Sequence, residues 1–229
     1  NHYKAFRLKF SMTKLIGIDD AGRGPVIGPM ILAGILIEEK EESIIKEWGA
    51  KDSKMLTPKK RGEIKEKISK KFKGHIEIST PKEIDESSNL NYLEAIKTAK
   101  IINKLTEDLN EKVNVIIDCP SVNIASWSND VQKLIEKPEI VNLSCEHKAD
   151  EIHPVVSGAS ILAKEKREDE IYRLKKEVGK DFGSGYPADP KTKEFIKDNF
   201  QDEKYKHIIR FSWNTVKRLF KEKDQKSLF

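Results

Sequence analysis

The sequence predicts an α/β domain with a mixed sheet, and three observations lead to this fold class. Two apolar runs, at residues 14–19 and 29–38, come first with a glycine-rich stretch between them, which is typical of an antiparallel hairpin. Strand-like and helix-like stretches then alternate, which is typical of parallel strands joined by helices. Acidic residues stand near the ends of several strand-like runs. We therefore expect a mixed five-stranded sheet flanked by helices, with a functional edge where its strands end.

Length and composition are those of a highly charged globular protein. The chain has 229 residues, enough to bury a sizeable core, of which 37% are hydrophobic and 35% charged. No apolar run in the sequence approaches the length of a membrane-spanning helix, and no stretch has the pattern of a secretory signal. The two cysteines, Cys119 and Cys145, lack metal-ligand spacing. We expect a cytoplasmic protein without a disulfide framework.

The distribution of charge is more informative than the net charge of +5. Residues 1–14 carry a net charge of +4 and residues 186–229 also carry +4, so residues 15–185 carry −3. An acidic-leaning centre between basic ends is typical of a metal site served by phosphate-binding segments. The alternative is the solvated surface of a protein rich in Lys and Glu, and charge alone does not decide between the two.

The first strand carries the strongest functional signal. Residues 1–13 show no period, and the position of Met12 suggests an N-terminal extension or an expression remnant. The apolar run 14–19 leads to Asp19 and Asp20, which are followed by Gly22, Gly24 and Gly28. Adjacent carboxylates suit a hard divalent cation, and glycines let the backbone approach a ligand closely. An ordinary solvated turn is the alternative interpretation of the same residues.

The middle of the chain predicts alternating elements. Residues 41–48 are typical of a short helix, and Thr57 followed by Pro58 marks the start of a longer one. Residues 75–79 alternate as a strand, and a Thr-Pro pair at 80–81 opens a helical turn. A long amphipathic helix follows, with apolar positions at Leu90, Leu93, Ile96, Ile102, Leu105 and Leu109.

The last elements bring further acids to strand ends. One strand at 113–118 ends in an acid, and another at 139–144 is followed within a few residues by a second acid. Helices are expected at 154–178, with Gly179 as the stop, at 190–200 and at 211–221. Functional sites in open α/β sheets gather at strand ends, so the acids that follow three strands are expected to converge. They are Asp19, Asp20, Asp118 and Asp150. Such a group of carboxylates favours a two-metal site for phosphoryl transfer.

Several blocks of the chain stand in a specific order between about Lys14 and Lys221. They are residues 17–25 (Gly-Ile-Asp-Asp-Ala-Gly-Arg-Gly-Pro), 51–54 (Lys-Asp-Ser-Lys), 90–95 (Leu-Asn-Tyr-Leu-Glu-Ala), the strand ending in Asp118, 147–150 (His-Lys-Ala-Asp), 154–164 and 183–190. In order and spacing these blocks resemble ribonuclease HII, the type 2 ribonuclease H, and in particular its archaeal members. The resemblance implies an RNase H-like fold over residues 14–185, a C-terminal helical segment at 186–223 and a tail at 224–229.

The resemblance also implies an activity. Ribonuclease HII is an endonuclease of DNA replication and repair that cleaves the RNA of RNA/DNA hybrids. It also incises 5′ to single ribonucleotides in duplex DNA and leaves a 3′-hydroxyl and a 5′-phosphate. Its metal-binding carboxylates match Asp19, Asp20, Asp118 and Asp150, which would bind two Mg²⁺ or Mn²⁺ ions. Because no side-chain nucleophile is required, we expect structural roles for His147 and His153.

Substrate-binding residues are implied by the same resemblance. In the family, the segment matching Gly22, Arg23 and Gly24 contacts the ribose through its backbone. The tyrosine matching Tyr186 hydrogen-bonds there and stacks on the next deoxyribose, although turn packing beside Pro187 is the alternative for this residue. Other expected phosphate contacts are Ser53 and Lys54, then less strongly Lys148 and Lys164, and for non-specific duplex binding Arg210, Lys217 and Arg218.

One position departs from the family pattern. Glu normally follows the first catalytic Asp, and here this position is Asp20. Asp is shorter by one methylene, or about 1.5 Å of reach, whereas Mg²⁺ requires oxygens at about 2.0–2.1 Å. Neighbouring strand residues also point to opposite faces, so Asp20 can assist Asp19 only if the strand has already ended. We expect an active enzyme with lower activity or with a preference for Mn²⁺.

The end of the chain and two alternative functions complete the predictions. Gln225, Leu228 and Phe229 resemble the start of a peptide that binds a sliding clamp, with a disordered tail as the alternative. A binding protein for RNA/DNA hybrids, catalytically weakened by Asp20, is the second function considered. A nucleotide-binding protein that uses the glycines as a phosphate loop ranks low, because Pro25 stands where a helix should open. A monomer is the default expectation.

Overall fold

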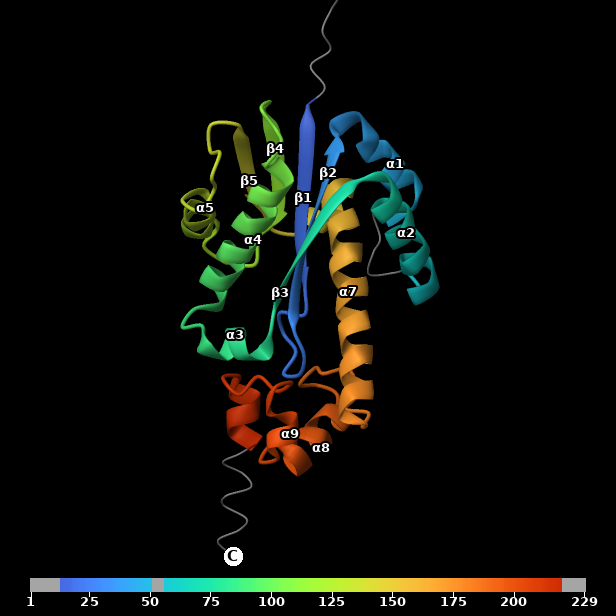
Figure 1. Cartoon of the computed structure of the whole chain (residues 1–229), viewed down its shortest axis with the longest axis vertical. Coiled ribbons are helices and arrows are strands. Elements are labelled where there is room, and N and C mark those ends of the chain that lie inside the picture. Colours follow the sequence, from blue (N-terminus) through green and yellow to red (C-terminus); the bar gives the residue numbers. More distant parts are fainter. Residues whose placement is uncertain (1–12, 51–55, 220–229) are drawn as a thin grey trace, which may run out of the picture.

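The computed structural model describes residues 13–50 and 56–219, and within them five strands form one sheet in the order β3-β2-β1-β4-β5 (Figure 1). β1 (Lys14–Ala21) pairs antiparallel with β2 (Met30–Glu38), which pairs antiparallel with β3 (Lys73–Ser79). β1 also pairs in parallel with β4 (Val113–Asp118), and β4 in parallel with β5 (Val141–Glu146). The predicted mixed five-stranded sheet is therefore confirmed. The parallel pairing brings the ends of β1, β4 and β5 to one edge.

Side-chain alternation along β1 divides the interior into two cores. Leu15 packs in the core under α7 (Pro154–Val178), and Ile16 packs on the opposite face under α4 (Leu90–Thr106). The first core also takes residues from α1 (Glu42–Glu47) and α2 (Pro58–Lys71), and the second from α5 (Ile124–Gln132). Figure 1 shows these two groups of helices on either side of the strands. α7 lies very close to β1, since a Cβ at Gly17 would stand 2.5 Å from the Val155 carbonyl carbon.

Helix ends follow the local signals of the sequence. The Thr57 hydroxyl accepts a hydrogen bond from the Lys60 amide at 3.3 Å, and Pro58 is the first residue of α2. α7 begins at Pro154 and is terminated by Gly179, whose φ of +68° is the left-handed conformation that favours glycine. The predicted helix starts at Pro58, Pro154 and Pro190 and the stop at Gly179 are confirmed, whereas the helix predicted from residue 211 begins at residue 214.

Other predicted boundaries are wrong or incomplete. β5 begins and ends two residues later than the predicted 139–144, and α4 ends at Thr106. Several short helical elements were not predicted, and they are η1 (Glu39–Glu41), α5, α6 (Ala149–Ile152) and α9 (Glu203–Lys206). The sequence of α5 is rich in Ser and Asn, which favour turns, and burial of Trp127 and Val131 stabilises the helix. α3 (Pro81–Glu86) confirms the predicted helical turn.

The C-terminal segment packs against the end of α7 and against the connection between β1 and β2. It contains α8 (Pro190–Asn199), α9 and a helical stretch at 214–219. A third core joins these helices to Val26, Ile27 and the last turns of α7. The Arg210 amide donates to the Val26 carbonyl at 2.9 Å, which brings this segment to the functional edge of the sheet (Figure 1). The division of the chain at 185/186 remains a prediction.

Candidate metal centre and substrate cleft

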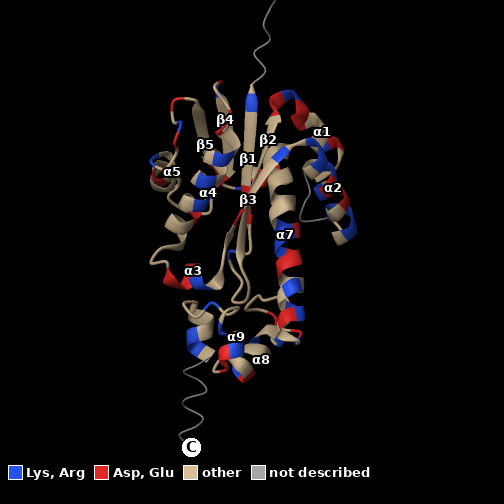
Figure 2. Ribbon diagram, in the orientation of Figure 1, with Lys and Arg blue, Asp and Glu red and all other residues tan. Residues whose placement is uncertain are grey.

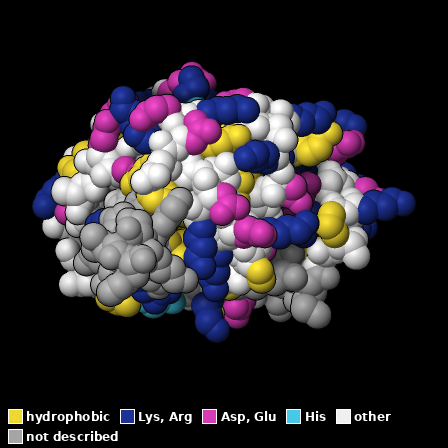
Figure 3. All heavy atoms as spheres, turned by 90° about the horizontal axis from the view of Figure 1, so that it is seen from below, with side chains coloured by type: hydrophobic (Ala, Val, Ile, Leu, Met, Phe, Trp, Pro, Cys, Tyr) yellow, Lys and Arg dark blue, Asp and Glu magenta, His cyan; other side chains and the backbone are white. Residues whose placement is uncertain are grey.

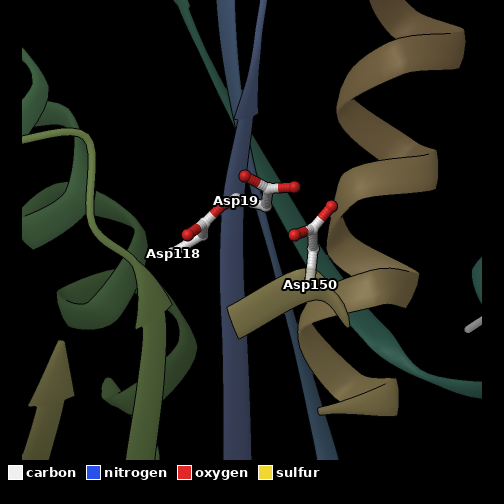
Figure 4. A group of neighbouring side chains, drawn as sticks. All are labelled: Asp19, Asp118 and Asp150. Atoms are coloured by element: carbon white, nitrogen blue, oxygen red, sulfur yellow. The ribbon is translucent and has the colours of Figure 1, made fainter. Parts of the chain in front are cut away.

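Three acidic side chains converge at the edge of the sheet. Among the described residues, Asp19, Asp118 and Asp150 each offer a carboxylate oxygen, and these oxygens all lie within 4.8 Å of one another. Figure 4 shows the three carboxylates pointing toward one another from β1, from the end of β4 and from the short helix α6. The parallel register, in which Ile18 stands opposite Ile117, places Asp19 beside Asp118. The pairing of β1 with β4 therefore places two of the three acids next to each other.

The third acid is positioned by a tight turn after β5. Lys148 adopts the left-handed conformation with a φ of +60°, which is uncommon for a residue with a side chain. It precedes Ala149, whose amide donates to the Asp118 Oδ1 atom at 3.2 Å. This hydrogen bond ties the start of α6 to the end of β4. Asp150, in the first turn of α6, is thereby held next to the other two acids.

The electrostatics of the three acids favour a bound cation. Burial raises the pKa of Asp19 well above its usual range, and the neighbouring carboxylates of Asp20 and Asp118 raise it further. The Asp20 amide donates to the Asp19 Oδ1 atom at 2.7 Å, which partly stabilises the charged form. Like charges at this separation and burial are costly without a compensating ion. A set of carboxylate oxygens is what hard divalent cations such as Mg²⁺ and Mn²⁺ bind, so the residues fit such an ion.

Asp20 lies apart from the other three acids. β1 continues to Ala21, so Asp20 belongs to the strand and alternates with Asp19, opposite Leu32 of β2. Burial raises the pKa of Asp20 to about 6, with a further increase from Asp118 and a decrease from nearby cations, of which Arg23 has the largest effect. The carboxyl therefore interacts electrostatically with the centre without joining the close group of three. Its role as a metal ligand remains a prediction.

A cleft of about 530 Å³ opens beside the acids. Its walls come from the end of β1, from α2, from α7 and from the loop before α8, and they are formed by Asp20, Ala21, Gly22, Arg23, Gly24, Arg61, Lys164, Arg167, Glu168 and Tyr186. We call residues 22–28, which connect β1 to β2, the glycine loop. The cleft therefore brings together the glycine loop and Tyr186, which the sequence placed far apart.

Tyr186 stands on a buried arginine. The Arg167 guanidinium lies 5.1 Å from the centre of the Tyr186 ring, and its Nη2 donates to the Ser184 carbonyl at 3.3 Å. Arg167 is buried, whereas Tyr186 is 43% exposed and presents its ring to the cleft. Gly22 has a φ of +87°, and a Cβ there would lie 2.5 Å from the Arg167 Cδ atom. Arg167 thus contacts both the glycine loop and the loop that carries Tyr186.

The charged surface outside the cleft is mixed. Figure 2 shows basic and acidic residues following one another along α7, where Arg173 pairs with Glu170 and Glu177. Seen from below, the surface in Figure 3 also shows dark-blue and magenta side chains next to each other. In the cleft, Arg61 pairs with Glu165 of α7 at 2.8 Å. In these two views of the described residues, basic and acidic side chains are therefore intermixed on the surface.

Comparisons with known proteins assign the family. The family model described as "Ribonuclease HII" matches residues 16–216. The chain belongs to the ribonuclease HII family. It is 42% identical to a ribonuclease HII of Methanococcus maripaludis (strain C6) over 226 residues, which cover 96% of this chain and 93% of the relative. The resemblance to archaeal members is thereby confirmed.

Solved structures support the same assignment. The ribonuclease H2 of Pyrococcus horikoshii OT3 superposes with a TM-score of 0.81 at 36% identity, over 92% of this chain and 98% of that one. The structure described as the PCNA:RNase HII complex from Archaeoglobus fulgidus gives a TM-score of 0.77 at 35% identity, over 90% and 96%. The protein is thus a hydrolytic endonuclease that acts on RNA/DNA hybrids. In the described part of this ribonuclease, every helix is too short or too polar to cross a membrane.

One expected nucleic acid contact is wrong. Arg210 was expected to bind the duplex from the C-terminal helices, but its side chain is fully buried in the ribonuclease. Its Nη2, Nη1 and Nε atoms donate to the carbonyls of Gly22 at 2.7 Å, Arg23 at 3.1 Å and Gly28 at 2.8 Å. Burial, with an additional effect of the nearby Arg167, lowers the pKa of Arg210 to about 9. Arg210 therefore supports the glycine loop and cannot contact a duplex.

The remaining predicted residues have varied outcomes. His147 Nδ1 lies 3.2 Å from the Cys119 carbonyl and His153 Nε2 lies 3.0 Å from Glu146 Oε2, contacts of the kind expected for structural histidines. Lys164 lines the cleft, and Lys148 stands next to the acids on the turn before α6. Exposed positions are occupied by Lys217 and Arg218. Residues outside the described part of the chain are Ser53, Lys54 and Gln225–Phe229.

Sequence reasoning missed Arg167 and Glu94 as parts of the site. A signal for Arg167 was present, because it follows Lys164 by three residues on one helix and so shares its face. Glu94 forms an ion pair with Arg23 although the two are far apart in the sequence. The local sequence pattern around either residue cannot predict an ion pair between residues so far apart in the chain.

Proposed function

We propose that this ribonuclease cleaves with two divalent ions, Mg²⁺ or Mn²⁺, and that it also incises 5′ to single ribonucleotides in duplex DNA. The observation that carries the proposal is the convergence of Asp19, Asp118 and Asp150 within 4.8 Å beside a cleft lined by cations. Asp20, one position along β1, is the fourth proposed ligand. The products would be a 3′-hydroxyl and a 5′-phosphate.

The side chains and the ions have separate tasks in this mechanism. Bound divalent ions supply activation of the attacking water and stabilisation of the departing oxygen. The three close carboxylates would hold the ions, because the sheet and the turn before α6 fix the positions of these side chains. Lys164 and Arg167 place positive charge along the cleft, where the phosphates of a nucleic acid strand would lie. We assign no side-chain nucleophile.

Recognition of the ribose is proposed for the glycine loop and Tyr186. Gly22 and Gly24 line the cleft without side chains, so backbone groups there can approach a 2′-hydroxyl. Tyr186 offers an exposed ring for stacking and a hydroxyl for a hydrogen bond. Ser53 and Lys54 remain proposed phosphate contacts that lie outside the described residues.

The deciding experiment is incision of a DNA duplex that carries one ribonucleotide, in Mg²⁺ and in Mn²⁺. We expect one cut on the 5′ side of the ribonucleotide, and no cut by the Asp118→Asn variant. The end groups of the products are identified by ligation and by phosphatase treatment. Tight binding without cleavage in either metal would refute the proposed mechanism and favour a weakened hybrid-binding protein.

The role of Asp20 is tested by lengthening its side chain. We propose that Asp20 reaches an ion only with a backbone adjustment or a bridging water, because β1 continues through this residue. Asp20→Glu should then raise the rate in Mg²⁺ by about tenfold or reduce the preference for Mn²⁺. Equal rates and equal metal preference in the two proteins would contradict this assignment.

We also propose that the tail binds a sliding clamp. Gln225, Leu228 and Phe229 provide the start of the motif, and the similar structure from Archaeoglobus fulgidus is described as a complex with PCNA. A synthetic peptide of the tail should bind the sliding clamp of the same organism in calorimetry. A peptide with Leu228 and Phe229 both changed to Ala is the matched control. Equal heats for the two peptides would contradict the proposal.

A further inference from the structure

The sequence block at residues 90–95 has no role in the mechanism described so far. It forms the first turns of α4, which packs on the face of the sheet opposite α7. Glu94 within this block is a buried carboxylate with 1% of its side chain exposed. It lines a small cavity together with Asp20, Asp118 and Thr98. A buried charge next to the candidate metal centre calls for a specific partner.

That partner is Arg23 of the glycine loop. The Arg23 Nη1 atom forms an ion pair with Glu94 Oε2, and Nη2 donates to Asn91 Oδ1 at 2.7 Å. Apart from this ion pair, neither carboxylate oxygen of Glu94 has a hydrogen-bond partner among the described residues. Arg23 therefore provides the main compensation for the buried carboxylate. The start of α4 is itself fixed, because Trp127 Nε1 donates to the Asn91 carbonyl at 2.9 Å.

Holding the Arg23 side chain also holds the loop that carries it. Arg23 stands between Gly22 and Gly24, which on their own leave the backbone free to move. Arg210 fixes carbonyl groups of this loop from one side, while Glu94 and Asn91 fix the Arg23 side chain from the other. The guanidinium is thereby held against the first turns of α4, where Arg23 also forms part of the cleft wall. A small displacement of a group that contacts the substrate has large effects on binding and rate.

We propose that Glu94 is a specificity-determining positioning residue, which anchors Arg23 to α4 and so keeps the glycine loop in the conformation that distinguishes ribose from deoxyribose. The inference rests on the proposed function of the glycine loop in contacting the 2′-hydroxyl. Glu94 itself touches no substrate. It acts through Arg23, and Asn91 assists it.

The test compares binding to two duplexes that differ by one oxygen atom. In the Asp118→Asn background, which prevents cleavage, affinities are measured in Mg²⁺ for a DNA duplex with one ribonucleotide and for the same duplex without it. The parent should prefer the ribonucleotide. Glu94→Gln should lower this preference by about tenfold while affinity for plain DNA stays within about twofold. A loss of folding alone would lower both affinities together.

Two further variants make the result specific. Glu83→Gln removes a partner of Lys97, another residue of α4, and should leave the preference unchanged. Asn91→Ala removes one of the two contacts to Arg23 at a less buried position, so it should lower the preference in the same direction by a smaller factor. It also provides a readout if Glu94→Gln does not fold.

Dependence on Arg23 is tested by a double-mutant cycle. If Glu94 acts through Arg23, Glu94→Gln should have no further effect on the preference in an Arg23→Met background. An unchanged preference in Glu94→Gln, or an equal loss with and without Arg23, would overturn the inference. A parent protein that shows no preference for the ribonucleotide would instead refute the proposed function of the loop, which is a distinct outcome.

Discussion

The candidate metal centre and the glycine loop lie side by side at one edge of the sheet, but they are held in different ways. Asp19 and Asp118 belong to neighbouring parallel strands, and the amide of Ala149 ties α6 to Asp118. The loop, by contrast, is held by the side chains of Glu94, Arg167 and Arg210, which come from three distant parts of the chain.

This difference separates the residues proposed for catalysis from those proposed for recognition of the ribose. Strand pairing places Asp19 and Asp118, and a turn places Asp150, so changing a carboxylate to an amide should remove its charge with little movement of its neighbours. Buried charged side chains place the loop, so changing one of them leaves unpaired groups behind and alters the structure. Variants of the centre should therefore lose activity while remaining folded, whereas variants around the loop should lose stability together with specificity.

The largest effect is expected for Asp150→Asn in the metal centre. Removal of one of three closely spaced carboxylates should lower activity by at least about 10³-fold, because groups that act as a unit fail together. The free energy of unfolding of the metal-free protein should stay the same or rise, since one of several like charges is lost. Single-turnover cleavage and urea unfolding measure the two quantities. A folded variant with nearly full activity would contradict the assignment of the centre.

The next largest effect is expected for Arg210→Met beside the glycine loop. The change leaves the carbonyls of Gly22, Arg23 and Gly28 without their buried donor, and we expect a loss of about 3 kcal/mol in the free energy of unfolding. Urea unfolding measures this loss. Arg218→Met, at an exposed position, is the control and should change stability by no more than about 0.5 kcal/mol. If the two variants were equally stable, the contrast between the regions would fail.

A smaller effect concerns pH and connects the two regions through Asp20. Its pKa in the folded protein is about 6, above the usual value of 3.8, and that of Asp19 is also raised. The carboxyl groups of Asp20 and Asp19 therefore bind a proton more tightly in the folded state than in the unfolded state. This contribution to stability is fully present below about pH 4 and is lost as the pH rises through about 6.

The measurement follows urea unfolding of the metal-free protein between pH 4 and 7. Over this pH range, we expect the free energy of unfolding to fall by about 2 kcal/mol less in Asp20→Asn than in the parent protein. Asp198→Asn, at an exposed position, should leave the slope unchanged. Added Mg²⁺ should oppose the fall in the parent protein, because a cation favours the charged carboxylates. The same slope in the parent and in Asp20→Asn would show that this carboxyl does not titrate as inferred.

The contrast between the regions also explains what the sequence could predict. Asp19 and Asp118 stand at the ends of apolar runs, so local pattern placed both at one edge of a parallel sheet. Arg210 lies 188 positions from Gly22, and its hydrogen bonds to the loop depend on the packing of the C-terminal segment. A basic residue on an amphipathic helix is usually solvated, and that general rule gave the wrong role for Arg210. The pair of Arg23 with Glu94 was missed for the same reason.

The smallest effect is expected at Tyr186, which lines the cleft together with the glycine loop. Tyr186→Phe keeps the ring and its contact with the Arg167 guanidinium at 5.1 Å, and it removes only the hydroxyl. We expect incision at a single ribonucleotide to fall by about two- to tenfold, the value of one hydrogen bond of about 0.5–1.5 kcal/mol. Cleavage of a long hybrid should fall less, because many alternative registers are available to the enzyme.

Rates on the two substrates are compared for Tyr186→Phe and for Tyr172→Phe, which changes another exposed tyrosine outside the cleft. The control should leave both rates unchanged. Equal losses on both substrates would assign the hydroxyl to general binding rather than to recognition of the ribose. A loss confined to the single ribonucleotide would place recognition on the loop side of the cleft, because the carboxylates are identical in the two proteins.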